Sequence, residues 1–324
     1  MITNPATKNF YCDRRVLVAG GDGFLGQNAV KALSALSADV TVLVRSGPNA
    51  QPRDVGRVLF GDLKDFAVAQ AAVGGQDIVL NFVGVTSAVH SNRDPRLSLR
   101  EECFPHLNLL TACAEIASPP LIVFPSSRLV YGVPLYLPVD EVHPTRPTNI
   151  YGAHKITVEH YLRIYQQTKG IPYLIFRISN PYGPYQAAKN KGYGIINYFL
   201  QLAVRGEPIR IFGDGSQIRD FIFVEDLIDI LLSAIVTPDC HNQIFNIGGR
   251  EPISLRAAAE SIALAAGGTP VILEPWPKDY QAVETGDYLS CVDKLGRFLD
   301  LAHLTSFEDG LARSIEAYRE LIKI

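Results

Sequence analysis

The sequence lacks several features that would each indicate a particular class of protein. It has no basic excess, with 30 Lys and Arg against 33 Asp and Glu in 324 residues, so binding to nucleic acid by phosphate neutralisation is not expected. No apolar run approaches the roughly 20 residues of a membrane span, and the run at 78–85 is interrupted by Asn81. Charged residues make up only 19% and hydrophobic residues 47%, which excludes intrinsic disorder.

Cysteine is scarce and follows no pattern. The count of five is odd, and no CxxC spacing occurs, so neither a disulfide framework nor a zinc site is supported and no metal is expected. We expect the thiols to be buried and free in a reducing compartment. Residues 1–14 lack the apolar segment of a signal peptide, which predicts an exposed tail and a cytoplasmic protein.

In the first half of the chain, short apolar runs alternate with amphipathic segments. The amphipathic segment at 24–36 is predicted to be a helix, and strands are predicted at 16–19, 40–44, 58–60, 77–83 and 121–124. Unbroken apolar strands between helices are typical of a parallel sheet that is covered on both faces. Right-handed crossovers then give a doubly wound α/β fold of the Rossmann type.

The composition of the sequence changes after residue 180, where Pro and Gly become frequent. This suits a second, smaller lobe that closes over a ligand. We therefore predict an N-terminal tail (1–14), a dinucleotide-binding domain (15–180, with a return at about 221–250) and a discontinuous C-terminal substrate lobe (181–220 and 251–324).

The motif AGGDGFLG follows the first predicted strand and opens the first predicted helix. Gly20 permits a tight turn, Gly23 lets the backbone approach a pyrophosphate, and Gly26 lets the helix pack closely. Phe24 and Leu25 lie at the helix N-terminus, which faces the phosphates. A plain strand-to-helix turn is the alternative, but the context on both sides favours a dinucleotide site.

The end of the second predicted strand bears on the choice of cofactor. Enzymes that use NAD carry an acid there for the ribose 2′-hydroxyl, whereas this chain has Arg45 and Ser46. These side chains are able to accept a 2′-phosphate, so the sequence favours NADP(H) without excluding NAD; an ordinary surface arginine is the alternative. Asp62 and Leu63, after the third strand, are placed to hold and pack the adenine.

Candidate catalytic residues follow later strands. Tyr151 and Lys155 are four apart and share one face of a predicted helix. A cation beside a phenol lowers its pKa from about 10. Such a tyrosine can move a proton to or from a sugar hydroxyl while hydride moves to or from nicotinamide. Ser127 would give the reacting oxygen a second hydrogen bond. The spacing alone occurs by chance, but the glycine motif and the serine make chance improbable.

Taken together, these segments resemble the extended short-chain dehydrogenase/reductases of the nucleotide-sugar epimerase/dehydratase family. The resemblance runs from about residue 16 to the C-terminus. Besides AGGDGFLG, it is carried by GDL, SSRLVYG, PTNIYGAHK, FRISNPYGP, IRIFGDGSQIRDFIFVEDL and NIGG. This set is specific for the family and much less specific for the substrate, which the resemblance implies to be a nucleoside-diphosphate sugar.

The resemblance implies roles for particular residues. Ser127 would be the catalytic Ser/Thr, Tyr151 the acid/base, and Lys155 the lysine that binds the nicotinamide ribose and lowers the tyrosine pKa. The residues implied along the cofactor are Phe82, Val83 and Gly84.

Further implied residues lie on the substrate side. Asn180 would meet the substrate phosphate or sugar, Arg219 would clamp the diphosphate, and Asp287 would bind ribose; Thr86 is a further substrate candidate. Family members commonly dimerise through two helices per subunit, which implies a homodimer through helices at about 97–117 and 151–169.

The chain departs from the family pattern at three places. Dehydratases carry acids directly after the catalytic Ser/Thr, whereas this chain has Arg128 and Leu129, which argues against 4,6-dehydration. Glu102 stands where members often have Asn, which puts a cofactor contact in doubt. The usual R-P-G-D becomes E-T-G-D with Glu284, so an arginine of the phosphate clamp is missing.

Three functions remain open from the sequence. The leading one is a nucleotide-sugar 4-epimerase, which oxidises C4 and returns the hydride to the other face. The second is an NADPH-dependent 4-keto-sugar reductase, which Arg45 favours. A degenerate cofactor-sensing module is disfavoured, because Ser127, Tyr151 and Lys155 are all intact.

Overall fold

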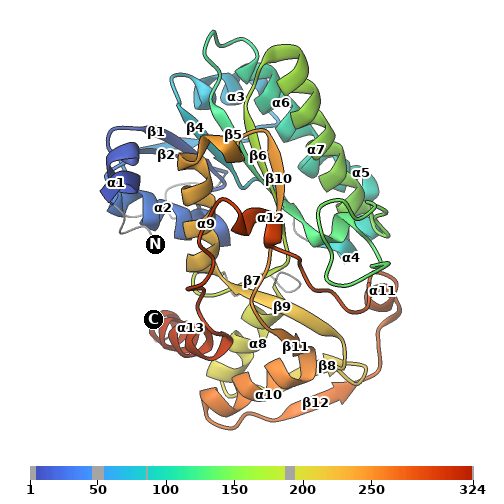
Figure 1. Cartoon of the computed structure of the whole chain (residues 1–324). Helices are drawn as coiled ribbons and strands as arrows, with labels where there is room; N and C mark the ends of the chain where they lie inside the picture. Colours follow the sequence, from blue (N-terminus) through green and yellow to red (C-terminus); the bar gives the residue numbers. More distant parts are fainter. Residues whose placement is uncertain (1–4, 46–54, 85–86, 187–193, 323–324) are drawn as a thin grey trace.

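A seven-stranded parallel sheet forms the centre of the computed structural model, which describes residues 5–45, 55–84, 87–186 and 194–322 (Figure 1). The strand order is β10-β6-β5-β4-β1-β2-β3, and every neighbouring pair is parallel. The strands are β1 (Arg15–Ala19), β2 (Asp39–Val44), β3 (Arg57–Phe60), β4 (Ile78–Asn81), β5 (Leu121–Ser127), β6 (Tyr173–Ile178) and β10 (Gln243–Ile247). The predicted doubly wound α/β fold is confirmed.

Helices cover both faces of this sheet because its strands are apolar on both sides (Figure 1). Along β1, Val16 and Val18 point into one hydrophobic cluster, while Leu17 and Ala19 point into the other. The first cluster packs against α1 (Pro5–Tyr11), α2 (Phe24–Ala35) and α9 (Val224–Val236). The second packs against α3 (Phe66–Val73), α6 (Phe104–Cys113) and α7 (Ile150–Lys169).

A third hydrophobic cluster holds together the lower part of the molecule in Figure 1. It lies among a three-stranded sheet, a two-stranded sheet and three helices. The strands are β7 (Asn180–Tyr182), β9 (Ile218–Phe223), β11 (Pro252–Ser254), β8 (Ile209–Phe212) and β12 (Val271–Glu274). The helices are α8 (Ile195–Val204), α10 (Leu255–Ala266) and α13 (Phe307–Ile322).

Short elements connect these parts. They are α4 (Ala88–Arg93), α5 (Pro95–Glu102), η2 (Arg128–Val130), η3 (Pro238–Cys240), α11 (Lys278–Gln281) and α12 (Asp293–Gly296). The single helix expected at 97–117 is instead two helices, α5 and α6, which meet at Cys103 with Pro105 in the first turn of α6. Proline is favoured there because it lacks the N–H that a first turn leaves unpaired.

The N-terminal segment differs from the exposed tail that the sequence predicts. Residues from Pro5 to Tyr11 form a helix, and the Tyr11 side chain is fully buried against α9. Its hydroxyl donates a hydrogen bond to the Leu232 carbonyl at 2.8 Å. Tyr11 and the neighbouring Phe10 pack into the first hydrophobic cluster. Burial of these two aromatic side chains explains why the short helix α1 packs against the parallel sheet domain.

Three further findings concern the described residues. All five cysteines are free thiols; Cys12 is exposed, contrary to expectation, and Cys291 is half-buried. No group of three or more His, Cys, Asp or Glu side chains within the described ranges is arranged to hold a metal ion. Searched in the same part of the chain, no helix is both long enough and apolar enough for a transmembrane span.

Candidate active site

The glycine-rich turn after β1 leaves no room for side chains. Gly20 has φ +81°, which favours glycine, and a Cβ there would lie 3.0 Å from the Phe82 carbonyl oxygen. A Cβ on Gly26 would lie 2.2 Å from the carbonyl oxygen of Gly20, so helix α2 packs directly on the turn. Gly23 immediately precedes α2, and no side chain caps the helix N-terminus. The backbone N–H groups at the start of α2 have no side-chain cap, and the glycines leave the adjacent backbone accessible, so this turn fits a dinucleotide pyrophosphate.

Charged side chains gather beyond the carboxyl ends of β2 and β3. The Arg45 Nη1 atom donates to Glu101 Oε2 at 3.1 Å. Lys64 also pairs with Glu101, and its Nζ lies 3.3 Å from Asp62 Oδ2. The hydrogen bond to Glu101 raises the pKa of Lys64. Arg45 is therefore at the predicted place but already has a carboxylate partner; Ser46 lies outside the described residues.

The remaining predicted cofactor residues lie near this edge of the sheet. Leu63 is buried, and its carbonyl accepts a hydrogen bond from Asn108 at 2.9 Å. The Phe82 N–H donates to the Ala19 carbonyl at 2.9 Å, which continues the β1–β4 pairing beyond β4. Val83 follows and packs against the second cluster. Gly84 has φ +143°, and a Cβ there would lie 2.9 Å from Glu102 Oε1.

The three predicted catalytic residues come from two elements. Ser127 ends β5, and its Oγ accepts a hydrogen bond from the Leu129 N–H at 3.2 Å. Tyr151 lies in the first turn of α7, with Lys155 one turn later. The Lys155 Nζ atom is 5.5 Å from the centre of the Tyr151 ring. Exposure is 9% for Ser127, 7% for Tyr151 and 3% for Lys155, so all three are shielded from water.

Two local features bring the start of α7 against the end of β5. Asn149 caps the helix by accepting a hydrogen bond from the Gly152 N–H at 2.9 Å. A Cβ on Gly152 would lie 2.4 Å from the Leu129 carbonyl oxygen, so only glycine lets α7 approach η2 this closely. Tyr151 is thereby held next to the segment that follows Ser127.

Glu102 forms an ion pair with Lys155, the predicted active-site lysine. Its side chain is only 1% exposed, and Oε2 lies 3.6 Å from Lys155 Nζ. One turn further along, burial and the positive charge of Lys155 lower the pKa of His106 to about 3, so this histidine is neutral. The glutamate at the family's asparagine position therefore counters the positive charge of Lys155.

Arg219, the predicted diphosphate clamp, is buried on β9. One amino group donates to the carbonyls of Ile218, at 2.8 Å, and Gly286. The other pairs with Glu284, whose carboxylate also accepts the Thr285 N–H at 3.0 Å. The glutamate that replaces the usual arginine thus neutralises the arginine that remains.

The other predicted substrate residues also meet at β9. The Asn180 amide donates to the Asp220 carbonyl at 3.1 Å, and Asp287 Oδ1 accepts the Ile218 N–H at 2.8 Å. Both side chains hold the loops around Arg219 in place, and their predicted ligand contacts stay predictions. Thr86 lies outside the described residues.

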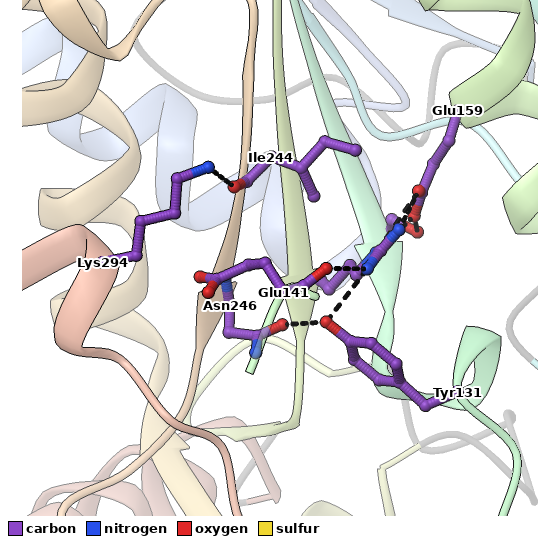
Figure 2. A network of polar contacts seen from close by, with 8 residues as sticks. Tyr131, Glu141, Glu159, Ile244, Asn246 and Lys294 are labelled. Carbon is purple, nitrogen blue, oxygen red and sulfur yellow. Dashed lines mark hydrogen bonds and ion pairs between the residues drawn. The ribbon is translucent and has the colours of Figure 1, made fainter. Parts of the chain in front are cut away.

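Figure 2 shows a buried polar network that includes Tyr131, Glu159 and Asn246. Arg177 on β6 makes a two-pronged contact with Glu159 on α7, with distances of 3.1 Å (Nε–Oε1) and 2.7 Å (Nη2–Oε2). Ser126 on β5 donates to the same carboxylate. Arg177 also donates to the Tyr131 hydroxyl at 3.1 Å, and that hydroxyl donates to Asn246 on β10 at 2.6 Å. The network joins α7 to three strands.

Sequence reasoning missed several of these residues. Arg177 stands in the otherwise apolar strand YLIFRI, and a charge in such a strand needs a buried partner, so a signal for the network was present. Gly21 was also overlooked: a Cβ there would lie 2.2 Å from Val42 Cγ1, so this glycine lets the turn pack on β2. Nothing local marked the pairing of Glu102 with Lys155.

A doubly wound parallel sheet with this glycine turn and a Tyr-Lys pair on the helix after β5 defines the extended short-chain dehydrogenase/reductase class. Within it, the chain belongs to the NAD-dependent epimerase/dehydratase family, whose model matches residues 16–248.

Similar proteins come from archaea and bacteria. A putative UDP-glucose 4-epimerase of Methanocaldococcus jannaschii is 32% identical over 73% of this chain and 77% of its own. The low-salt glycan biosynthesis protein Agl12 of Haloferax volcanii is 30% identical over 94% of this chain and 98% of its own. The solved UDP-glucose 4-epimerase of Thermus thermophilus, in complex with NAD, is 27% identical with a TM-score of 0.82, covering 94% of this chain and 99% of that one.

The Glu102–Lys155 pair predicts a coupled loss of stability. Glu102→Gln leaves the Lys155 ammonium buried without a carboxylate, and we expect the free energy of unfolding to fall by about 3 kcal/mol. Lys155→Met, which buries the carboxylate alone, should cost a similar amount. The double variant should cost clearly less than the sum in denaturant titrations. Additive losses would contradict a direct interaction between the two side chains.

Proposed function

We propose that the protein is a nucleoside-diphosphate-sugar 4-epimerase that works with a bound NAD(P). The observation that carries this proposal is the burial of Tyr151, Lys155 and Ser127 near the carboxyl end of β5, at the edge of the parallel sheet that also carries the glycine-rich turn after β1. The UDP-glucose 4-epimerases among its relatives support the same function. A bound NAD(P), whose pyrophosphate the turn around Gly20 and Gly23 would hold, would supply the nicotinamide that exchanges a hydride with the sugar C4.

The chain's own residues handle the proton and exclude water. Tyr151 takes the proton of the C4 hydroxyl as the hydride leaves that carbon, and returns it when the hydride comes back to the other face. Ser127 donates a hydrogen bond to the same oxygen. Lys155 supplies positive charge beside the phenol, and Glu102 limits that charge. Low exposure of the three groups keeps water from the oxidised sugar.

Two other reactions of the family are distinguished by particular residues. A 4-keto-sugar reductase would use the same three groups but release its cofactor after each turnover. A 4,6-dehydratase needs acids after Ser127, where this chain has Arg128, whose side chain donates to Thr285 at 3.0 Å. We propose that dehydration does not occur.

Turnover of nucleotide sugars tests the proposed epimerase function. Purified protein is incubated with UDP-, dTDP-, GDP- and CDP-hexoses, and inversion at C4 is followed by NMR. We expect a C4 epimer from at least one sugar and no 4-keto-6-deoxy product. Tyr151→Phe should lower kcat about 10²- to 10⁴-fold with the cofactor still bound. Tyr165→Phe, on the same helix with its hydroxyl near Thr111, is the matched control.

Two results would overturn this assignment. One is near-normal turnover by Tyr151→Phe. The other is a protein that gives no epimer, is purified without cofactor, and instead consumes NADPH stoichiometrically with a 4-keto sugar, which would identify a reductase.

We further propose that Arg45 favours NADP(H), with Glu101 opposing it. Arg45→Asp should weaken NADP(H) binding about 10- to 100-fold, because a charge-assisted hydrogen bond to the 2′-phosphate is lost, and should weaken NAD(H) much less. Glu101→Gln should tighten NADP(H), because its carboxylate no longer holds Arg45 and Lys64. Fluorescence titration measures both cofactors; a wild type that prefers NAD tenfold or more would contradict the role of Arg45.

The homodimer implied by the family is proposed to form through α5, α6 and α7. These helices carry exposed apolar side chains, with Leu97 52%, Phe104 54% and Ile164 51% exposed. Light scattering after size exclusion should give twice the chain mass for the wild type and one chain mass for Phe104→Asp. Leu264→Asp, at a more exposed apolar position on α10, should remain dimeric. A monomeric wild type would sink this proposal.

A further inference from the structure

Arg128 directly follows the proposed catalytic serine, and Glu284 and Asp220 act on its charge from beyond ion-pair distance within the described part of the chain. This serine is Ser127, and Arg128 opens η2. Its Nη1 donates to Thr285 Oγ1 at 3.0 Å, and its Cζ lies 5.2 Å from the centre of the Tyr288 ring. Thr285 is neutral, and Tyr288 is fully buried. Among the described residues Arg128 has no ion pair, so most of its N–H donors are left for a ligand.

The neighbouring cations of the site differ from Arg128 in this respect. Lys155 is paired with Glu102, and Arg219 is paired with Glu284. Desolvation, together with the positive charge of Arg219, lowers the pKa of Arg128 to about 10, and the group is still charged at neutral pH. A cation that is withdrawn from water needs an opposite charge. Glu284 and Asp220 favour the charged form of Arg128 only from a distance, so an anion in direct contact with its free N–H donors would stabilise it further.

Arg128 and Arg219 reach the same loop from different elements. Arg128 comes from the end of β5 and touches Thr285, while Arg219 comes from β9 and touches Gly286. This loop contains E-T-G-D, where the family pattern has its second clamp arginine in place of Glu284. The family's positive charge at position 284 is missing from this chain. Arg128, 156 positions earlier in the sequence, places a positive charge beside the same loop.

We propose that Arg128 is the second arginine of the site that holds the diphosphate of the nucleotide sugar, in place of the arginine whose position Glu284 occupies. This assignment rests on the proposed function. Because Glu284 already neutralises Arg219, Arg128 makes the larger electrostatic contribution to binding. The guanidinium group suits this role, since its fixed fork of donors matches two phosphate oxygens.

Position favours a diphosphate over an anionic group on the sugar itself. Arg128 is directed toward Thr285, two residues before Asp287, the proposed ribose ligand, and lies close enough to Arg219 for their charges to repel. An anion shared by two arginines near the ribose ligand is the diphosphate. A carboxylate at C6 of the sugar is also an anion that an arginine binds, and the experiment distinguishes it from the diphosphate.

Binding without turnover tests the assignment. Calorimetry is carried out on the wild type and Arg128→Met with UDP, dTDP, GDP and CDP, and with the matching nucleosides. For the nucleotide that the wild type binds best, Arg128→Met should weaken the diphosphate about 10- to 100-fold and leave the weak nucleoside affinity unchanged. Arg128→Lys should fall between the two, because its single ammonium cannot contact two oxygens at once.

A second variant separates this role from a merely structural one. Glu284→Arg, placed in the Arg128→Met background, restores a clamp arginine at the family position and should recover most of the lost diphosphate affinity. Glu284→Gln alone should tighten binding, because it frees Arg219. Circular dichroism and retained dinucleotide binding confirm that each variant is folded. A merely structural role for Arg128 predicts no rescue by a change at Glu284.

The outcomes are distinct from those that test the epimerase reaction. If folded Arg128→Met binds nucleoside diphosphates as the wild type does, the assignment is wrong. If it loses affinity only for UDP-glucuronate and keeps it for UDP and UDP-glucose, the anion belongs to the sugar and the diphosphate assignment is overturned. A protein that binds nucleoside diphosphates through Arg128 but does not invert C4 would retain this site and lose only the proposed function.

Discussion

The buried ion pair between Glu159 and Arg177 is the interaction on which the arrangement of the site depends. Glu159 lies one turn beyond Lys155 and two turns beyond Tyr151 on α7. Its ion pair with Arg177 on β6 therefore fixes the position of α7 along the sheet and its rotation about its own axis, and with them the positions of Lys155 and Tyr151. Ser126 shares the same carboxylate and is adjacent to Ser127. One carboxylate therefore sets the positions of a helix and a strand end whose side chains, Tyr151 and Ser127, are proposed to contact one sugar oxygen.

The site around this support is organised by charge. Each of two cations has a partner acid at a position where the family pattern has a different residue: Glu102 for Lys155, and Glu284 for Arg219. Among the described residues no acid forms an ion pair with Arg128, and Glu284 and Asp220 act on its charge only from further away. Opposite charges in a low-dielectric site interact strongly. An acid in place of the family's asparagine at position 102 and arginine at position 284 therefore changes where in the site a negatively charged ligand binds most favourably. The electric field on the proposed substrate side of this chain thus differs from that of the family pattern, although Ser127, Tyr151 and Lys155 match that pattern.

Much of the fold and the reaction centre was predictable from local sequence. Strands buried on both faces read as unbroken apolar runs, and the observed β1, β2 and β3 each begin one residue before the prediction. The glycine-rich turn, the Tyr151–Lys155 spacing and the place of Ser127 are also local, because each depends on a few consecutive residues and on the period of one helix. The prediction of an exposed N-terminal tail was wrong, because the short helix there packs its aromatic side chains against a distant element, as Tyr11 does on α9.

What the sequence alone determined is therefore the doubly wound sheet, the glycine-rich turn and the placement of Tyr151 and Lys155 one turn apart on a helix, since backbone sterics and side-chain periodicity act over a few residues. Only the tertiary structure decided which charges face one another: Glu102 with Lys155, Glu159 with Arg177, and Arg128 beside Thr285. The members of these pairs come from different elements, 53, 18 and 157 residues apart. Their meeting depends on the order in which strands join the sheet, and no local pattern in the sequence records that order.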